Sequence, residues 1–92
     1  MKKTIEMFNR TFVCYIHSEF QGLMGAVNIF EVVRPKWKIF RTKFCDYCTF
    51  WLSDYDSIEA GVRACIRRYV REEIEQARIY AQWIDFQNSK DW

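Results

Sequence analysis

The sequence predicts an α+β fold in which a four-stranded antiparallel β-meander is followed by a long C-terminal amphipathic helix. Two observations favour this fold. Residues 11–52 contain segments rich in β-branched and aromatic residues, separated by turn signals. From residue 56 to residue 85, apolar residues recur at steps of three and four, as in a helix packed on one side. With 92 residues, the chain is expected to form one domain, residues 1–92.

The first two predicted strands are residues 11–20 and 26–34, separated by a loop that holds two of the three glycines. Pro35 cannot donate a ladder hydrogen bond, which predicts a turn at residues 34–36. Residues 37–44 and 47–52 then predict two strands joined by a tight hairpin at Cys45 and Asp46. Residues 4–8 fit either an extra strand or a short helical turn.

The helical region is predicted to begin with Asp56 as N-cap and Glu59 completing a capping box. One apolar stripe then faces the sheet; it consists of Ile58, Val62, Cys65, Ile66 and Tyr69. A second stripe follows, rotated by roughly 90°, and consists of Val70, Ile74, Ala77, Ala81 and Ile84. Because one straight helix cannot bury both stripes against one sheet, the pattern predicts either a kink or break near Arg71 or a second half that packs elsewhere. Residues 87–92 are expected to form a polar tail.

Composition excludes several classes of protein. Half of the residues are hydrophobic and 18% are aromatic. A chain of this composition is too apolar to be disordered. Its aromatic side chains are also more than the thin core of a small domain can bury, so some of them are expected on the surface. The formal net charge of +2 excludes a strongly acidic nucleic-acid mimic. Glu6, Asn9 and Arg10 interrupt any export signal, and no window is apolar enough for a membrane span. We therefore expect a cytoplasmic protein without membrane contact, whose four cysteines are mostly thiols.

The pairs Cys14 with His17 and Cys45 with Cys48 have the spacing of zinc ligands. In an extended strand, however, residues three apart point to opposite faces, so Cys14 and His17 do not converge. Buried cysteines and a surface histidine are the expected arrangement. The sequence contains no glycine-rich phosphate loop and no dinucleotide fingerprint. A non-catalytic protein without a cofactor is therefore expected.

Basic residues on the helix form the main candidate binding surface. The arginines fall close together beyond the first apolar stripe, with two aromatic residues further along, and the candidate partner-binding set is Arg63, Arg67, Arg68, Arg71, Arg78, Tyr80 and Trp83. The alternative is a solvated face, in which these arginines pair with glutamates four positions away.

A second candidate surface lies on the predicted third strand, where basic and aromatic residues alternate as in single-stranded nucleic-acid platforms. Its members are Lys36, Trp37, Lys38, Arg41 and Lys43. A strand with one buried and one solvated face gives the same alternation.

In its size, expected location and order of sheet then helix, the chain resembles the small inhibitors that bacteriophages make against host defence, anti-CRISPR proteins among them. The resemblance is one of build over the whole chain, and it transfers no residue. It implies a non-catalytic protein that blocks a larger host nucleic-acid-processing complex in the host cytoplasm. The arginines and exposed aromatics would dock on a protein subunit or on bound RNA or DNA. The alternative hypothesis is a small nucleic-acid-binding regulator that uses the basic strand, with or without a structural zinc.

Overall fold

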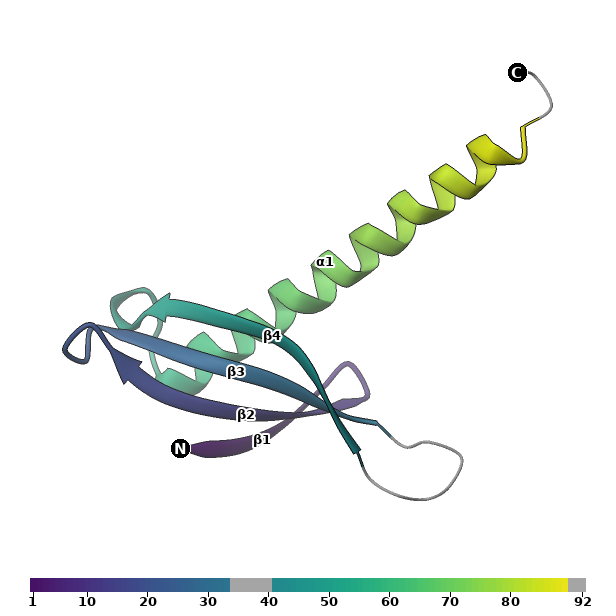
Figure 1. Ribbon diagram of the computed structural model, residues 1–92. Helices are drawn as coiled ribbons and strands as arrows, with labels where there is room; N and C mark the ends of the chain where they lie inside the picture. Colours follow the sequence, from purple (N-terminus) through teal and green to yellow (C-terminus); the bar gives the residue numbers. More distant parts are fainter. Residues whose placement is uncertain (34–40, 90–92) are drawn as a thin grey trace.

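The computed structural model describes residues 1–33 and 41–89. Four antiparallel strands form one open sheet in the order β1 (Lys2–Met7), β2 (Arg10–Glu19), β3 (Met24–Val33) and β4 (Arg41–Trp51). A short 3-10 turn, η1 (Leu52–Asp54), leads to a single long helix, α1 (Ile58–Gln87). Figure 1 shows the sheet lying against the first part of α1 only. The predicted α+β meander with a C-terminal helix is confirmed.

The strands that make up the meander differ from the predicted ones. Residues 2–7 form a strand, so the sheet begins before residue 11. The two strands predicted at 37–44 and 47–52 are one strand, β4, in the described part of the chain. Phe44 lies opposite Phe30 and Asp46 opposite Ile29, which leaves Cys45 as a bulge. The predicted hairpin at Cys45 and Asp46 is wrong because a bulge bends a strand without reversing it. The predicted turn at 34–36 falls outside the described residues.

Two hairpin turns use residues with positive φ that are not glycine. Phe8 and Asn9, between β1 and β2, both have a φ of 57°, as a two-residue type I′ turn requires. Phe20 and Gln21 open the next turn with φ values of 52° and 55°, followed by Gly22 at 84°. Because bulky residues rarely adopt this conformation, the sequence gives no turn signal at Phe8.

The helix begins one residue later than predicted. Ser57 is the N-cap, and its hydroxyl accepts a hydrogen bond from the Ala60 amide at 3.1 Å. Asp56 is therefore not the cap, and Glu59 instead forms an ion pair with Lys3 on β1 at 3.1 Å. From Ile58 to Gln87 the helix is continuous, and Figure 1 shows one rod. Of the two alternatives that the pattern left open, the kink or break near Arg71 is therefore not formed.

The core lies between one face of the sheet and the first half of α1. On the helix, Val62, Cys65 and Ile66 of the predicted stripe are buried, Tyr69 is half-buried against the core, and Ile58 is exposed. Val70, which was assigned to the second stripe, is also buried. The sheet contributes alternate residues of its central strands, among them Phe12, Cys14, Ile16, Val27 and Ile29. Cys48 on β4 and Cys65 on α1 form a disulfide with a Cα–Cα distance of 6.2 Å. The helix is thus covalently joined to the sheet.

Glycines allow the helix to approach the sheet closely at Phe50. A Cβ atom added at Gly25 would lie 2.5 Å from the Phe50 ring, and one added at Gly61 would be closer still. Real Cβ atoms do not approach other atoms so closely. The ring therefore occupies space that only two glycines leave open, one on β3 and one on α1.

The molecule is elongated. Its radius of gyration is 17.1 Å and its longest extent is 57 Å, whereas a compact domain of this length has a radius of gyration of about 12 Å. Figure 1 shows the cause, because the second half of α1 extends away from the sheet. Of the second stripe, Val70 is buried in the core, whereas the members from Ile74 onward are exposed and do not fold back onto the domain.

Candidate docking surface

The second half of α1 is exposed along its whole length. All residues from 71 to 87 are exposed, and Glu73 is the last of them that hydrogen-bonds to the sheet in the described residues. We call residues 74–87 the free arm, which at 1.5 Å per residue is about 20 Å long. Its large apolar side chains have exposed fractions from 37% to 68% and are Ile74, Ile79, Tyr80, Trp83, Ile84 and Phe86.

Apolar residues of the free arm lie on two opposite faces. At about 100° per residue, Ile74, Ala77, Ala81 and Ile84 lie along one side. Ile79, Trp83 and Phe86 lie about 180° away from them, and the rings of Trp83 and Phe86 contact edge to face with centroids 6.1 Å apart. A surface helix of a globular domain has one apolar face, so this arm has more apolar surface than its own domain covers.

The predicted arginine surface divides into paired and unpaired residues. Arg63 pairs with Glu59 at 4.0 Å, and Arg78 pairs with Glu75 at 2.5 Å. Arg68 is turned toward the sheet, where it donates a hydrogen bond to the Cys48 sulfur at 3.0 Å. Within residues 1–33 and 41–89, Arg67 and Arg71 have no ion-pair partner and are exposed. Of the predicted arginine set, these two therefore remain unpaired in the described residues, at the base of the free arm.

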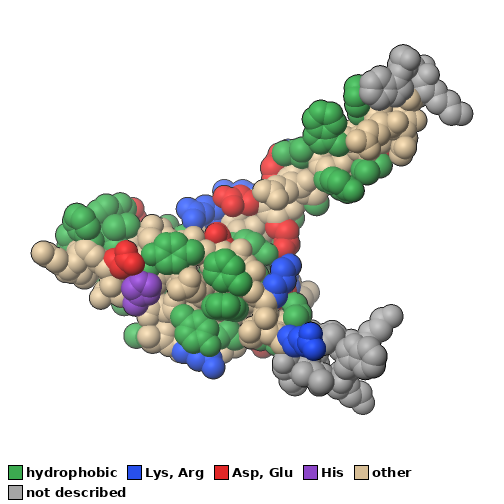
Figure 2. Space-filling model, viewed as in Figure 1, with side chains coloured by type: hydrophobic (Ala, Val, Ile, Leu, Met, Phe, Trp, Pro, Cys, Tyr) green, Lys and Arg blue, Asp and Glu red, His purple; other side chains and the backbone are tan. Residues whose placement is uncertain are grey.

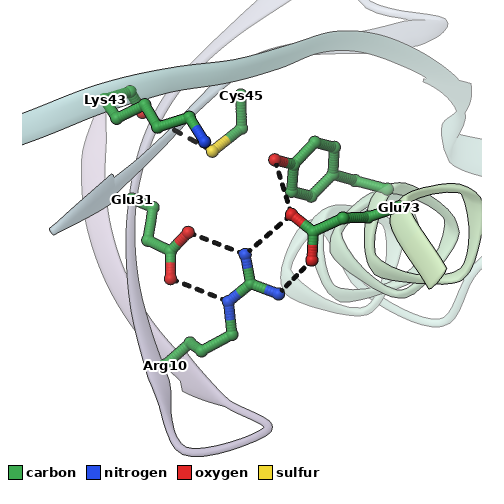
Figure 3. Close-up of polar contacts among 6 residues, drawn as sticks. Arg10, Glu31, Lys43, Cys45 and Glu73 are labelled. Atoms are coloured by element: carbon green, nitrogen blue, oxygen red, sulfur yellow. Dashed lines mark hydrogen bonds and ion pairs between the residues drawn. The ribbon is translucent and has the colours of Figure 1, made fainter. Parts of the chain in front are cut away.

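Three charged residues fix the helix to the sheet just before the free arm (Figure 3). Arg10 on β2 donates to both carboxylate oxygens of Glu31 on β3, each at 2.7 Å. The same guanidinium donates to Glu73 on α1 at 2.8 and 3.2 Å, and the Tyr69 hydroxyl donates to Glu73 at 3.2 Å. These hydrogen bonds to Arg10 lower the pKa of both carboxyl groups. This Arg10 cluster and the disulfide are two attachment points for α1.

The sheet face opposite α1 carries a row of aromatic side chains. Tyr15, Phe30 and Phe44, from three neighbouring strands, contact edge to face with centroids 5.5 and 5.4 Å apart. Tyr47 is on the same face and donates a hydrogen bond to Glu19, which also contacts the His17 ring at 2.9 Å. Figure 2 shows hydrophobic side chains gathered over the sheet and again along the projecting helix. The sequence predicts surplus surface aromatics but not which residues form this row.

The basic and aromatic residues of the predicted nucleic-acid strand do not share a surface where the structure describes them. Lys43 lies opposite Glu31, on the helix side of the sheet, and Arg41 follows the same alternation. Phe44 lies opposite Phe30 on the other face. Lys36, Trp37 and Lys38 fall outside the described residues.

The four residues with zinc-ligand spacing do not come together in one site. Cys14 is buried on the helix side of the sheet, whereas His17 is exposed on the other face. Cys48 is bonded to Cys65, contrary to the expected thiols, because folding places these two residues together across the core. Burial raises the pKa of the Cys14 thiol to about 11, which makes it a poor nucleophile and metal ligand. Among the described residues, no three His, Cys, Asp or Glu side chains are grouped to hold a metal ion.

No protein-family model, curated protein or solved structure matches this chain. Among the described residues, no helix is long and apolar enough to cross a membrane.

Proposed function

We propose that this chain is a non-catalytic binding protein that blocks a larger host nucleic-acid-processing complex by occupying a surface on it. The observation that carries the proposal is the free arm, with Ile79, Tyr80 and Trp83 between 44% and 68% exposed. A helix that inserts into a groove of another protein presents apolar anchors at helical spacing. The free arm has this form without any rearrangement of the domain.

The residue types of the arm are those that contribute most at protein interfaces. Tryptophan, tyrosine and arginine are enriched among residues whose truncation weakens binding strongly. Trp83 and Tyr80 lie on the arm, and Arg67 and Arg71 lie at its base. An apolar groove with an acidic or phosphate-bearing rim complements this arrangement, because the arginines form charge-assisted hydrogen bonds with carboxylate or phosphate oxygens.

Inhibition would then be steric. The arm enters the groove, and the sheet domain at its base covers the surrounding surface. Since this mechanism needs neither a reaction centre nor a cofactor, we propose that none is used. The nucleic-acid-binding alternative is less favoured, because Arg41 and Lys43 lie on the face opposite Phe44.

The test is affinity capture with the tagged protein in cells of its natural host, followed by binding measurements with the stoichiometric partner. We expect Trp83→Ala to weaken binding at least about tenfold, because truncating a central aromatic anchor usually costs more than 1.4 kcal/mol. We expect Arg67→Glu to weaken it as well, with a steeper loss at low salt.

The matched control is Trp51→Ala, which removes an exposed tryptophan from the sheet instead of the arm. It should leave the affinity within about threefold. Unchanged binding by the Trp83 variant would refute docking through the arm. Salt-dependent binding of single-stranded RNA or DNA by the isolated protein would favour the nucleic-acid-binding regulator instead.

A further inference from the structure

The second apolar stripe has the spacing of a coiled-coil seam. Successive members are separated by four, three, four and three residues, and they are Val70, Ile74, Ala77, Ala81 and Ile84. These separations place them at alternating d and a positions of two heptads. We call these five residues the seam. Val70 is buried at its base, Ile74 is 64% exposed, and Ile84 is 37% exposed.

We propose that a second copy of this chain covers the exposed part of the seam, from Ile74 to Ile84, with the two free arms packed as an antiparallel coiled coil. The proposal rests on the proposed function in treating the arm as a docking element, and it deepens that function by naming the occupant of one of its two faces. Small side chains at Ala77 and Ala81 let two helices approach closely at the middle of the contact. Isoleucines at both ends then interdigitate around this centre.

Antiparallel pairing brings each Ala77 opposite Ala81 of the second copy and each Ile74 opposite Ile84 of the second copy. The residues flanking the seam then meet in pairs. Arg71 lies across from Asp85 of the second copy, and this ion pair occurs twice by symmetry. Within the described residues, neither Arg71 nor Asp85 has an ion-pair partner in its own chain. The seam is therefore flanked by complementary charges that the monomer leaves unpaired.

Arg78 lies at the centre of this arrangement, facing its own symmetry mate. Each Arg78 is already paired with Glu75 of the same chain at 2.5 Å, which offsets the repulsion between them. On the other side of the seam, Tyr80 meets Tyr80 of the second copy.

A parallel arrangement fits less well. It would pair Glu73 of one copy with Arg78 of the other, but Glu73 is already bonded to Arg10 and Tyr69. It would also bring both sheet domains to the same end of the coiled coil. Antiparallel arms separate the two domains and leave Ile79 and Trp83 of each copy exposed for the larger partner.

The oligomeric state tests the proposal directly. Sedimentation equilibrium or light scattering over a concentration series should give twice the chain mass of 11.3 kDa, with dissociation at roughly micromolar concentration because the seam is only two heptads long. Ala77→Glu with Ala81→Glu should give a monomer, since both charges enter the seam. Gln76→Glu with Gln82→Glu is the matched control, because it adds the same charges outside the seam and should leave the dimer intact.

A charge swap tests the direction of the arms. Arg71→Asp alone should weaken the dimer at least about tenfold by creating two like-charge pairs, and Arg71→Asp with Asp85→Arg should restore it. Failure of the double variant to recover would overturn the antiparallel arrangement. Circular dichroism should show the same helix content in every variant.

Other outcomes separate this proposal from the proposed function. A wild-type chain that stays at 11.3 kDa up to about 1 mM overturns self-association, as does equal dissociation of the seam and control variants. If the seam variant becomes monomeric and still captures the larger partner through Trp83, both proposals hold. If the dimer forms as expected but the Trp83 variant binds the partner unchanged, self-association stands and docking through the arm falls.

Discussion

Arg10 connects three elements with one side chain. It forms paired hydrogen bonds with Glu31 on β3 and Glu73 on α1, which lie 21 and 63 positions away in the sequence. Local patterns predict contacts over three or four residues on a helix, and the pairing of Arg63 with Glu59 is one of these. The Arg10 cluster was beyond prediction because it depends on which strand faces which turn of the helix.

Glu31→Gln should lower the free energy of unfolding by about 1–3 kcal/mol near neutral pH, because it removes a carboxylate hydrogen-bonded to Arg10. The pKa of Glu31 is lowered in the folded protein from an ordinary value of 4.5. Its contribution is therefore fully present above about pH 4.5 and is lost as the pH falls through the folded-state value. Urea unfolding at about pH 7 and about pH 3 should show the difference between variant and wild type shrinking in acid.

Glu72→Gln is the control for this experiment. Glu72 precedes Glu73 on the helix and is exposed, so its substitution should change stability by less than about 0.5 kcal/mol. If the destabilisation by Glu31→Gln were the same at both pH values, the ionic contribution of the cluster would be disproved.

The elements themselves follow mostly from the sequence. The apolar period identifies α1 and its buried face, whereas its cap was misplaced by one residue because Asp56 and Ser57 are both good capping residues. The strands were harder to delimit. A turn at Phe8 and Asn9 lacks the usual glycine, and a bulge at Cys45 resembles a hairpin in sequence.

Gly61→Ala tests how closely α1 approaches the sheet. In an isolated helix, alanine is more favourable than glycine by about 1 kcal/mol. Here a Cβ atom at Gly61 would collide with the Phe50 ring, so we expect a net destabilisation of about 1–3 kcal/mol. Thermal or urea unfolding measures the change.

The control is Gly61→Ala made in a Phe50→Leu background. Because leucine is smaller than phenylalanine, Gly61→Ala should lower the free energy of unfolding less in this background than in the wild type. A stabilising Gly61→Ala substitution in the wild-type background would show that helix and sheet are not in close contact there.

At the scale of the whole molecule, the disulfide determines how firmly helix and sheet stay together. Cys48 and Cys65 are 17 positions apart, and closing a loop of this length stabilises a fold by about 3 kcal/mol. We expect Cys48→Ser with Cys65→Ser to lower the free energy of unfolding by about this amount. Reducing agent should have a similar effect on the wild type and little effect on the double variant.

Cys45→Ser is the matched control, because Cys45 is a free cysteine, and this variant should keep the response to reducing agent. Detection of four reactive thiols in the unreduced, denatured wild type would refute the disulfide. A disulfide detected in the protein as purified from its host would argue against the predicted cytoplasmic location, because disulfides persist mainly in oxidising compartments.

The layout of the candidate surface was only partly predictable. The rotation of the apolar stripe near Arg71 correctly indicated that one sheet could not bury the whole helix. It did not show that the helix runs straight past the sheet, because a kinked helix and an extended one give the same residue pattern. The aromatic row of Tyr15, Phe30 and Phe44 needed the strand register, which short-range patterns do not determine.

The disulfide, the Arg10 cluster and the packed core hold the first half of α1 on the sheet and so set the direction of the free arm. Cys65 and Glu73 are eight residues apart, a span of about 12 Å along the helix axis, and each is fixed to a different part of the sheet. A rod clamped at two separate points keeps its direction, whereas a rod clamped at one point pivots. A binding partner therefore meets an arm whose orientation is already set, which reduces the entropy lost on association. Reduction of the disulfide or protonation of Glu73 would each remove one of these attachments, while Val62, Ile66 and Val70 keep the first half of α1 packed on the sheet.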